Sequence, residues 1–138
     1  MTHDEIMKLE AGRELDALVA EKVMGYTPVK VTEYPAYDDN RNWVDIGDYV
    51  IYPEGVAFCT RVKDYSTDIS AAWQVMEKIE SLDNVQGVGL RGGEYYWKQY
   101  SLRWNFWVNN NGMYPEVDVY GETAPLAICR AALMAVQA

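Results

Sequence analysis

Two tryptophans and an arginine share one face of the most regular strand pattern in the sequence. Between residues 95 and 108 the side chains alternate with the period of two expected of a strand, and one side carries Trp97, Arg103 and Trp107. Indole rings can stack on a planar ligand, and a guanidinium group can pair with an anion. The competing interpretation, which the pattern favours, is that a layer of helices covers this face. We keep the three residues as candidate ligand-binding groups.

Three further candidates lie outside this strand. Ser66 and Asp68 come just before an apolar series with helical spacing, and both are more simply explained as helix caps than as binding groups. Trp43 lies in the aromatic-rich segment 26–65, whose prolines predict a long and partly irregular excursion. Excursions of this kind often present binding groups on a rigid scaffold. Ser66, Asp68 and Trp43 therefore join the candidate ligand-binding residues.

The sequence contains little catalytic machinery. His3 is the single histidine, which removes histidine-rich metal sites and histidine-dependent triads unless the N-terminal segment folds into a site. Cys59 and Cys129 each stand among apolar residues and are expected to be reduced, packed thiols. A hydrolase that uses two of the 21 acidic residues stays an alternative, although no spacing singles out a pair of carboxylates. We predict no catalytic residue, no metal and no cofactor.

Two short motifs match binding loops in spacing but not in context. Residues 87–92 fit the pattern GxGxxG, but a strand pattern follows where a dinucleotide site needs a helix, so a hairpin is predicted. Residues 38–42 begin like a calcium loop. Trp43 and Tyr49 then occupy the positions of the required glycine and glutamate, so a turn is predicted instead.

Length and charge favour one acidic globular domain. A chain of 138 residues supports a single domain, residues 1–138. The formal net charge of −9 argues against direct binding to nucleic acid, whose phosphates need a positive surface. No apolar run approaches the roughly 20 residues of a membrane span, and residues 1–5 lack the basic start of a secretory signal. The expected location is the cytoplasm.

Helices are predicted at both ends and in the middle of the chain. Thr2 and Glu5 have the spacing of a capping box at the first helix. A second helix over residues 11–24 has a weak point at Gly12 and a stop at Gly25. The apolar face of the third, residues 69–79, is expected to place Trp73 in the core.

Strands fill the interval before the last helix. The segments 85–90, 95–108 and 114–120 predict an antiparallel meander, with Trp104 buried strongly enough that Trp104→Ala costs roughly 3–5 kcal/mol. Thr123 then caps an almost wholly apolar helix. Its one charge, Arg130, is expected to pair with a carboxylate such as Asp16 or Glu14, or to reach solvent. Within the excursion, residues 49–52 and 56–58 are strand candidates.

Three stretches, residues 11–25, 65–73 and 124–133, together resemble the phage ABA sandwich domain family, whose members are small proteins of phages and prophages. The resemblance implies an α+β fold in which an antiparallel meander carries helices on both faces, as an α/β/α sandwich. It implies little about activity, and residues 26–65 match no motif of the family.

The absent catalytic machinery, the aromatic excess and the resemblance favour a non-enzymatic phage accessory protein in the host cytoplasm. It would bind a host protein or a small signalling ligand such as a nucleotide-derived immune signal. The alternatives are a carboxylate-dependent hydrolase and a structural or assembly protein of the phage. Because tyrosine and tryptophan are enriched at interfaces, we also expect a homo-oligomer with Tyr34, Tyr37, Trp43 and Tyr49 near the contact.

Overall fold

The computed structural model describes the chain except residues 55–57, 83–84, 93–99, 107–115 and 138, and gives only the backbone at 86–87, 91–92, 100–106 and 116–118. Its helices are α1 (His3–Met7), α2 (Arg13–Lys22), α3 (Ile69–Glu80) and α4 (Ala124–Gln137). Five short strands, β1 (Val29–Lys30), β2 (Ala36–Tyr37), β3 (Trp43–Val44), β4 (Tyr49–Ile51) and β5 (Thr60–Arg61), lie between α2 and α3. Three longer ones, β6 (Val85–Gly92), β7 (Tyr100–Phe106) and β8 (Glu116–Gly121), precede α4.

The last helix, α4, is the centre of the molecule. Its residues are buried from Pro125 to Cys129 and from Ala131 to Ala135, as an apolar helix without a solvent face requires. It contacts the other three helices and strands β6, β7 and β8. The predicted cap at Thr123 is confirmed, because the Thr123 hydroxyl accepts a hydrogen bond from the Leu126 amide.

Strands β6, β7 and β8 form the predicted antiparallel meander. The register pairs Val88 with Trp104 and Trp104 with Val117. Residues 87–92 lie within β6, which pairs antiparallel with β7. The prediction that the glycine motif is followed by a strand, and not by the helix of a dinucleotide site, is therefore confirmed. The Trp104 side chain lies outside the described residues, and its predicted burial stays a prediction.

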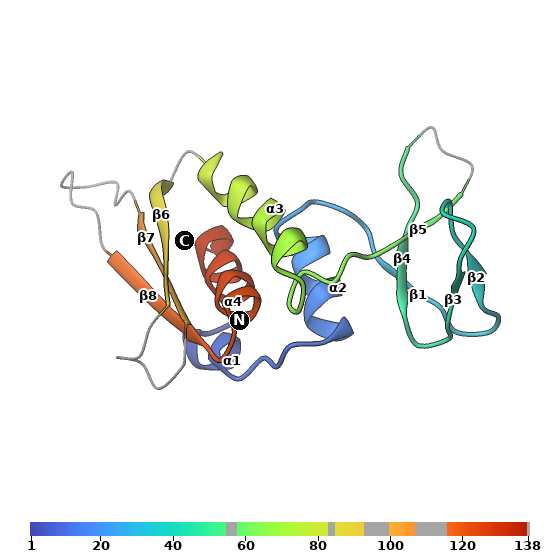
Figure 1. The fold of residues 1–138 in the computed structure, drawn as a ribbon, viewed down its shortest axis with the longest axis horizontal. Helices are drawn as coiled ribbons and strands as arrows, with labels where there is room; N and C mark the ends of the chain where they lie inside the picture. The colour runs from blue at the N-terminus through green and yellow to red at the C-terminus, as the bar shows by residue number, and fades with distance from the viewer. Residues whose placement is uncertain (55–57, 83–84, 93–99, 107–115, 138) are drawn as a thin grey trace.

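The described helices lie on one side of this sheet. Helices α3 and α4 contact its strands, and Figure 1 shows α2 farther from the sheet and α1 beside the lower end of α4. The mixed helices and antiparallel sheet confirm the α+β class. Helices on both faces, and with them the α/β/α sandwich, are not confirmed by the described residues.

Helix α3 begins where predicted, but its buried face is turned relative to the prediction. Asp68 caps the helix by accepting a hydrogen bond from the Ser70 amide. The buried residues are Ala71, Ala72, Val75, Met76 and Ile79. The prediction that Trp73 lies in the core is wrong, since 49% of its surface is exposed. Helix α3 packs on the alanine-rich helix α4, and small side chains let two helices approach closely where an indole would hold them apart.

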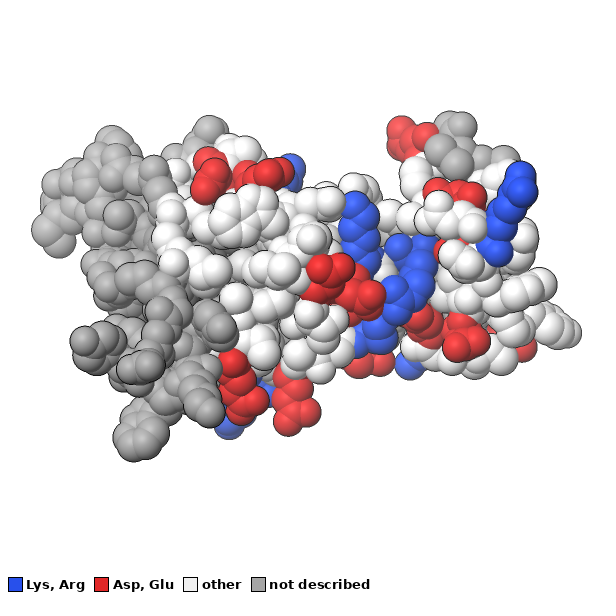
Figure 2. Space-filling view, in the orientation of Figure 1, with Lys and Arg blue, Asp and Glu red and all other residues white. Residues whose placement is uncertain are grey.

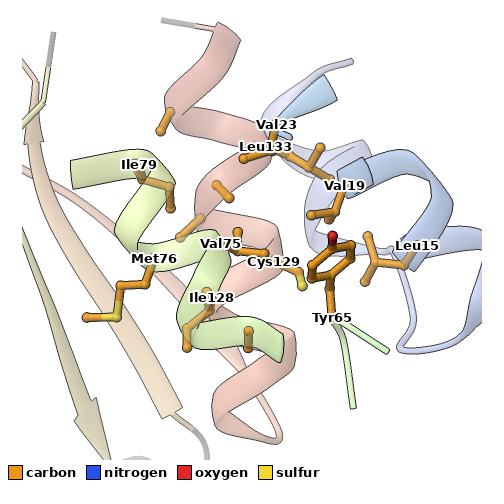
Figure 3. Packing of buried hydrophobic residues seen from close by; sticks show 14 of the residues in the cluster. Leu15, Val19, Val23, Tyr65, Val75, Met76, Ile79, Ile128, Cys129 and Leu133 are labelled. Atoms are coloured by element: carbon orange, nitrogen blue, oxygen red, sulfur yellow. The ribbon is translucent and has the colours of Figure 1, made fainter. Parts of the chain in front are cut away.

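The first two helices begin and end near the residues predicted from the sequence. The capping box of Thr2 and Glu5 is present at α1. Gly12 precedes α2 with φ 154°, and Gly25 follows it with φ 78°, a value that L-residues rarely adopt. Leu15 and Val19 of α2 pack toward α4, and the ring of Tyr65 lies between Leu15 and Cys129 (Figure 3).

Residues 29–61, here called the outer lobe, stand apart from the helices (Figure 1). They form a three-stranded antiparallel sheet in the order β1-β4-β5 and a β2-β3 hairpin. The strand predicted over residues 49–52 is confirmed as β4, whereas most of the candidate at 56–58 lies outside the described residues. Val31, Val44, Val50 and Cys59 make a second small core inside the lobe.

Candidate functional site

A cluster of two arginines and three aspartates lies where the outer lobe meets the helices. Arg13, at the start of α2, donates through Nε to Asp48 Oδ1 at 2.5 Å. Its Nη1 donates to Asp16 Oδ2 at 3.0 Å and to Asp64 Oδ1 at 2.9 Å. Its Nη2 donates to the carbonyl oxygen of Val62 at 2.6 Å. One guanidinium group therefore joins α2, the outer lobe and the segment that leads into α3.

Arg61 of β5 completes the cluster from the lobe side. Its Nε donates to Asp48 Oδ2 at 2.9 Å, and its two terminal nitrogens donate to Asp64, each at 3.2 Å. Asp48 thus accepts hydrogen bonds from both arginines, one on each oxygen. Planar guanidinium groups suit such shared carboxylates better than an ammonium group does.

Asp16 is the buried member of the cluster. Only 1% of it is exposed, and its Oδ1 accepts hydrogen bonds from the Ser66 amide at 2.7 Å and from the Ser66 hydroxyl at 2.6 Å. Burial raises the pKa of this carboxyl group above its usual value of 3.8, and the hydrogen bonds from Ser66 and the charge of Arg13 oppose that rise.

The pKa of Asp48 is shifted in the opposite direction from that of Asp16. Partial burial alone would raise its pKa, but hydrogen bonds from the Tyr49 amide, Arg13 and Arg61 outweigh that effect. The pKa of Asp48 is therefore lowered from its usual value of 3.8. The two guanidinium groups of the cluster are paired with its three carboxylates, which exceed them by one negative charge.

A polar cleft of about 420 Å³ lies beside the cluster. It runs between the turn at residues 38–42, the segment 61–64 and the first turns of α3, and its lining includes Arg61, Lys63 and Asp68. The predicted turn is confirmed, because the buried Asp38 carboxylate accepts hydrogen bonds from the Asn40 and Asn42 amides at 2.9 and 2.8 Å.

Large aromatic side chains are exposed on the outer lobe. Tyr34 is 79% exposed and Trp43 is 68% exposed, and the Trp43 ring contacts that of Tyr37 with centroids 5.0 Å apart. Tyr52 and Phe58 are also exposed. Tyr49, which we expected at the same surface, is only partly exposed, because it packs against the main core. Its hydroxyl group donates a hydrogen bond to the Glu14 carboxylate.

The predicted site residues are not assembled into one site by the described structure. Asp68 lines the cleft, and Ser66 is fully buried two residues away, where its hydroxyl also contacts the backbone of Gly12. Trp43 is exposed on the lobe and does not line the cleft. Arg103 pairs in register with Gly89 and Asp118, and its side chain lies outside the described residues, as do Trp97 and Trp107 entirely.

The arginine–aspartate cluster was not predicted from the sequence. Arg13 and Asp16 have helical spacing, but Asp48, Arg61 and Asp64 are brought to them only by the fold. The one local signal was Asp16 itself, a carboxylate between the apolar positions Leu15 and Val19. Arg130 also has unpredicted partners: it donates to the carbonyl oxygens of Leu9 and Tyr120, not to a carboxylate.

The two cysteines are free and buried, as predicted. Burial raises the pKa of both thiols, so neither is activated as a nucleophile. Within the described residues no group of three or more histidine, cysteine, aspartate or glutamate side chains has a geometry that could hold a metal ion. None of the described helices is long and apolar enough to cross a membrane.

These features define an α+β protein with a central apolar helix, a meander and an exposed aromatic lobe. The chain belongs to the phage ABA sandwich domain family, which it matches over residues 17–133. The match confirms the resemblance and, unlike the stretches that first indicated it, also spans the outer lobe. No curated protein and no solved structure matches the chain.

Proposed function

We propose that this phage protein binds a host protein in the host cytoplasm through the aromatic side chains of its outer lobe, without catalysing a reaction. The observation that carries the proposal is the exposure of Tyr34, Tyr37 and Trp43 on a lobe whose own core is small. Exposed tyrosine and tryptophan side chains give large contact areas at low cost in conformational entropy, and they are common at the centres of interfaces.

A comparison of two surface variants tests this proposal. The double variant Tyr34→Ser/Trp43→Ser removes aromatic surface from the lobe, and Trp73→Ser removes an exposed indole from α3 as a matched control. We expect a protein from host-cell extract to be retained by the wild type and by Trp73→Ser and lost by the double variant. The purified partner should then show the same order of affinity by calorimetric titration. Retention of the same proteins by all three would contradict the proposal.

A small signalling ligand is the second candidate, and the cleft beside the arginine–aspartate cluster supports it. Arg61 and Lys63 supply hydrogen-bond donors there, and Asp68 supplies an acceptor. Native mass spectrometry after incubation with infected-cell extract should detect a retained ligand. Lys63→Gln should weaken its retention, whereas Lys22→Gln, at an exposed position on α2, should not.

The two remaining alternatives have separate tests. A carboxylate-dependent hydrolase would turn over a member of a nucleotide panel, and replacing one clustered aspartate would abolish that turnover. The hydrogen bonds from both arginines to Asp48 and Asp64 do not favour this function, because they occupy the carboxylate oxygens. A structural or assembly role would place the protein in purified virions.

A further inference from the structure

We infer that the ion pairs of Arg13 and Arg61 with Asp48 and Asp64, here called the latch, fix the orientation of the outer lobe on the helices. When the latch opens, the lobe turns about strand β4. This inference goes beyond the proposed function, because it concerns how the lobe is held and not what it binds.

The outer lobe has the internal packing of a unit that can move as a body. Its own core contains Val31, Val44, Val50 and Cys59, which are separate from the main core around α4. Within the described residues, the strand-to-strand contacts of β1 to β5 are extensive only inside the lobe. The lobe is therefore held together by interactions that do not depend on the helices.

Strand β4 is the element shared by the two cores. Val50 is buried in the core of the lobe, whereas Tyr49 and Ile51 pack partly buried against the main core. This follows from the alternation of side chains along a strand. Tyr49 and Ile51 are only partly buried where they pack against the main core. The lobe can therefore turn about strand β4 more easily than it could if these side chains were fully buried.

The chain enters the lobe through an open turn. Gly25 has φ 78°, and a side chain placed there would meet nothing within 4 Å. Thr27 and Pro28 then lead to β1 at the surface. This passage adds little packing between the lobe and α2, so the orientation of the lobe is set mainly by contacts elsewhere.

The latch supplies those contacts. Arg13 reaches from α2 to Asp48 in the lobe and to Asp64 after it, and Figure 2 shows basic and acidic side chains gathered in the band between the helices and the lobe. The Arg13 and Asp48 side chains are 23% and 16% exposed. A second pair at this junction, Lys30 with Glu14, is 3.8 Å long with side chains 51% and 78% exposed. Such an exposed pair contributes little, whereas removing one partner of a partly buried network leaves its other charges uncompensated.

Distance measurements between two spin labels test the latch. One label is placed in the lobe at Glu33→Cys and the other on α3 at Glu77→Cys, both at exposed positions, while the native cysteines are buried. We expect a narrow distance distribution in the otherwise unaltered chain. In Arg13→Gln and in Asp48→Asn the distribution should broaden and shift, while the helical circular dichroism signal is retained.

Lys30→Gln is the matched control, because it removes a charge from the same junction without touching the latch. Its distribution should match that of the parent chain. An unchanged distribution in folded Arg13→Gln and folded Asp48→Asn would overturn the inference. Should one variant fail to fold, the other decides. Should both fail, Asp64→Asn decides, because it removes one ion pair from each arginine at a side chain that is 42% exposed. An unchanged distribution in folded Asp64→Asn would likewise overturn the inference.

Discussion

Ser66 and Asp16, fifty positions apart in the chain, are joined by two hydrogen bonds to one carboxylate oxygen. The Ser66 hydroxyl also contacts the backbone of Gly12, so a single buried serine connects the start of α2 to the segment before α3. Its side chain was a candidate for ligand binding, and in the structure it is fully buried among these hydrogen bonds.

Ser66→Ala should lower the free energy of unfolding by about 1–3 kcal/mol, because it removes a donor from a buried carboxylate and an acceptor from the Gly12 amide. Urea denaturation measures the change. Ser70→Ala, at an exposed position in the first turn of α3, is the control and should change stability by less than about 0.5 kcal/mol. Equal effects of the two substitutions would show that the buried hydrogen bonds contribute nothing net.

The lowered pKa of Asp48 predicts a contribution to stability that depends on pH. The unfolded chain has the usual value of 3.8, and the folded value is lower. The stabilisation is therefore present above pH 3.8 and is lost as the pH falls through the folded pKa. The stability difference between the wild type and Asp48→Asn should shrink on acidification from about pH 5 to about pH 3. Denaturation by urea at several pH values measures it.

Two further variants are compared with Asp48→Asn in the same experiment. Glu77→Gln removes one negative charge from the exposed face of α3 and is the control for the loss of a carboxylate outside the cluster. Asp16→Asn should give the opposite trend, because the raised folded pKa of Asp16 means that acidification toward pH 3.8 favours the folded wild type. If the stability differences of Asp16→Asn and Asp48→Asn changed in the same direction with pH, the opposite pKa shifts of the two aspartates would be contradicted.

The helices and the meander could be predicted because their signals are local. Thr2 with Glu5, Asp68 and Thr123 are caps that act within one helical turn, and the alternation over β7 and β8 needs no distant partner. The orientation of α3 could not be predicted so well. Both Trp73 and Val75 fit an amphipathic pattern, and only the alanine-rich surface of α4 decides which of them is buried.

The arginine–aspartate cluster and the partners of Arg130 depend on the tertiary fold. Nothing near Arg13 in the sequence indicates Asp48 or Asp64, which are 35 and 51 positions away. Arg130 was expected to pair with a carboxylate or to reach solvent, but it donates instead to backbone carbonyl groups of Leu9, after α1, and Tyr120, in β8. Sequence patterns do not indicate which backbone carbonyl groups a distant guanidinium group will meet.

Replacing Arg130 should therefore destabilise the junction of α1, β8 and α4. Arg130→Met keeps much of the aliphatic stem but leaves the carbonyl groups of Leu9 and Tyr120 without these donors, at a cost of about 1–3 kcal/mol. Urea denaturation measures the loss. Lys78→Met, at an exposed position on α3, is the control and should stay within about 0.5 kcal/mol of the wild type. No loss in Arg130→Met would mean that water replaces the guanidinium group without cost.

The exposed aromatic side chains of the outer lobe also predict self-association, which a host protein that binds the same surface would have to displace. With Tyr49 occupied at the junction, the contact is expected to involve Tyr34, Tyr37 and Trp43. Burying these rings against a second copy would remove their apolar surface from water. Sedimentation equilibrium at tens of micromolar should give a dimer or larger symmetric oligomer, and Tyr34→Ser/Trp43→Ser should give a monomer. A monomer mass for the wild type would contradict the prediction.

Gly121 at the end of β8 should not tolerate a side chain. A Cβ atom there would lie 2.5 Å from the backbone nitrogen of Ala127 and 2.9 Å from its Cα, distances at which something must shift. Since both atoms belong to the backbone of α4, rotation of a side chain cannot relieve the overlap. Gly121→Ala should therefore move the central helix against the sheet and lower the free energy of unfolding by about 1–3 kcal/mol, measured by urea denaturation. Adding Ala127→Gly, which removes only a methyl group, should not restore stability. Full restoration by that second substitution would show that the side chain of Ala127, and not the approach of the helix backbone, requires glycine at this position.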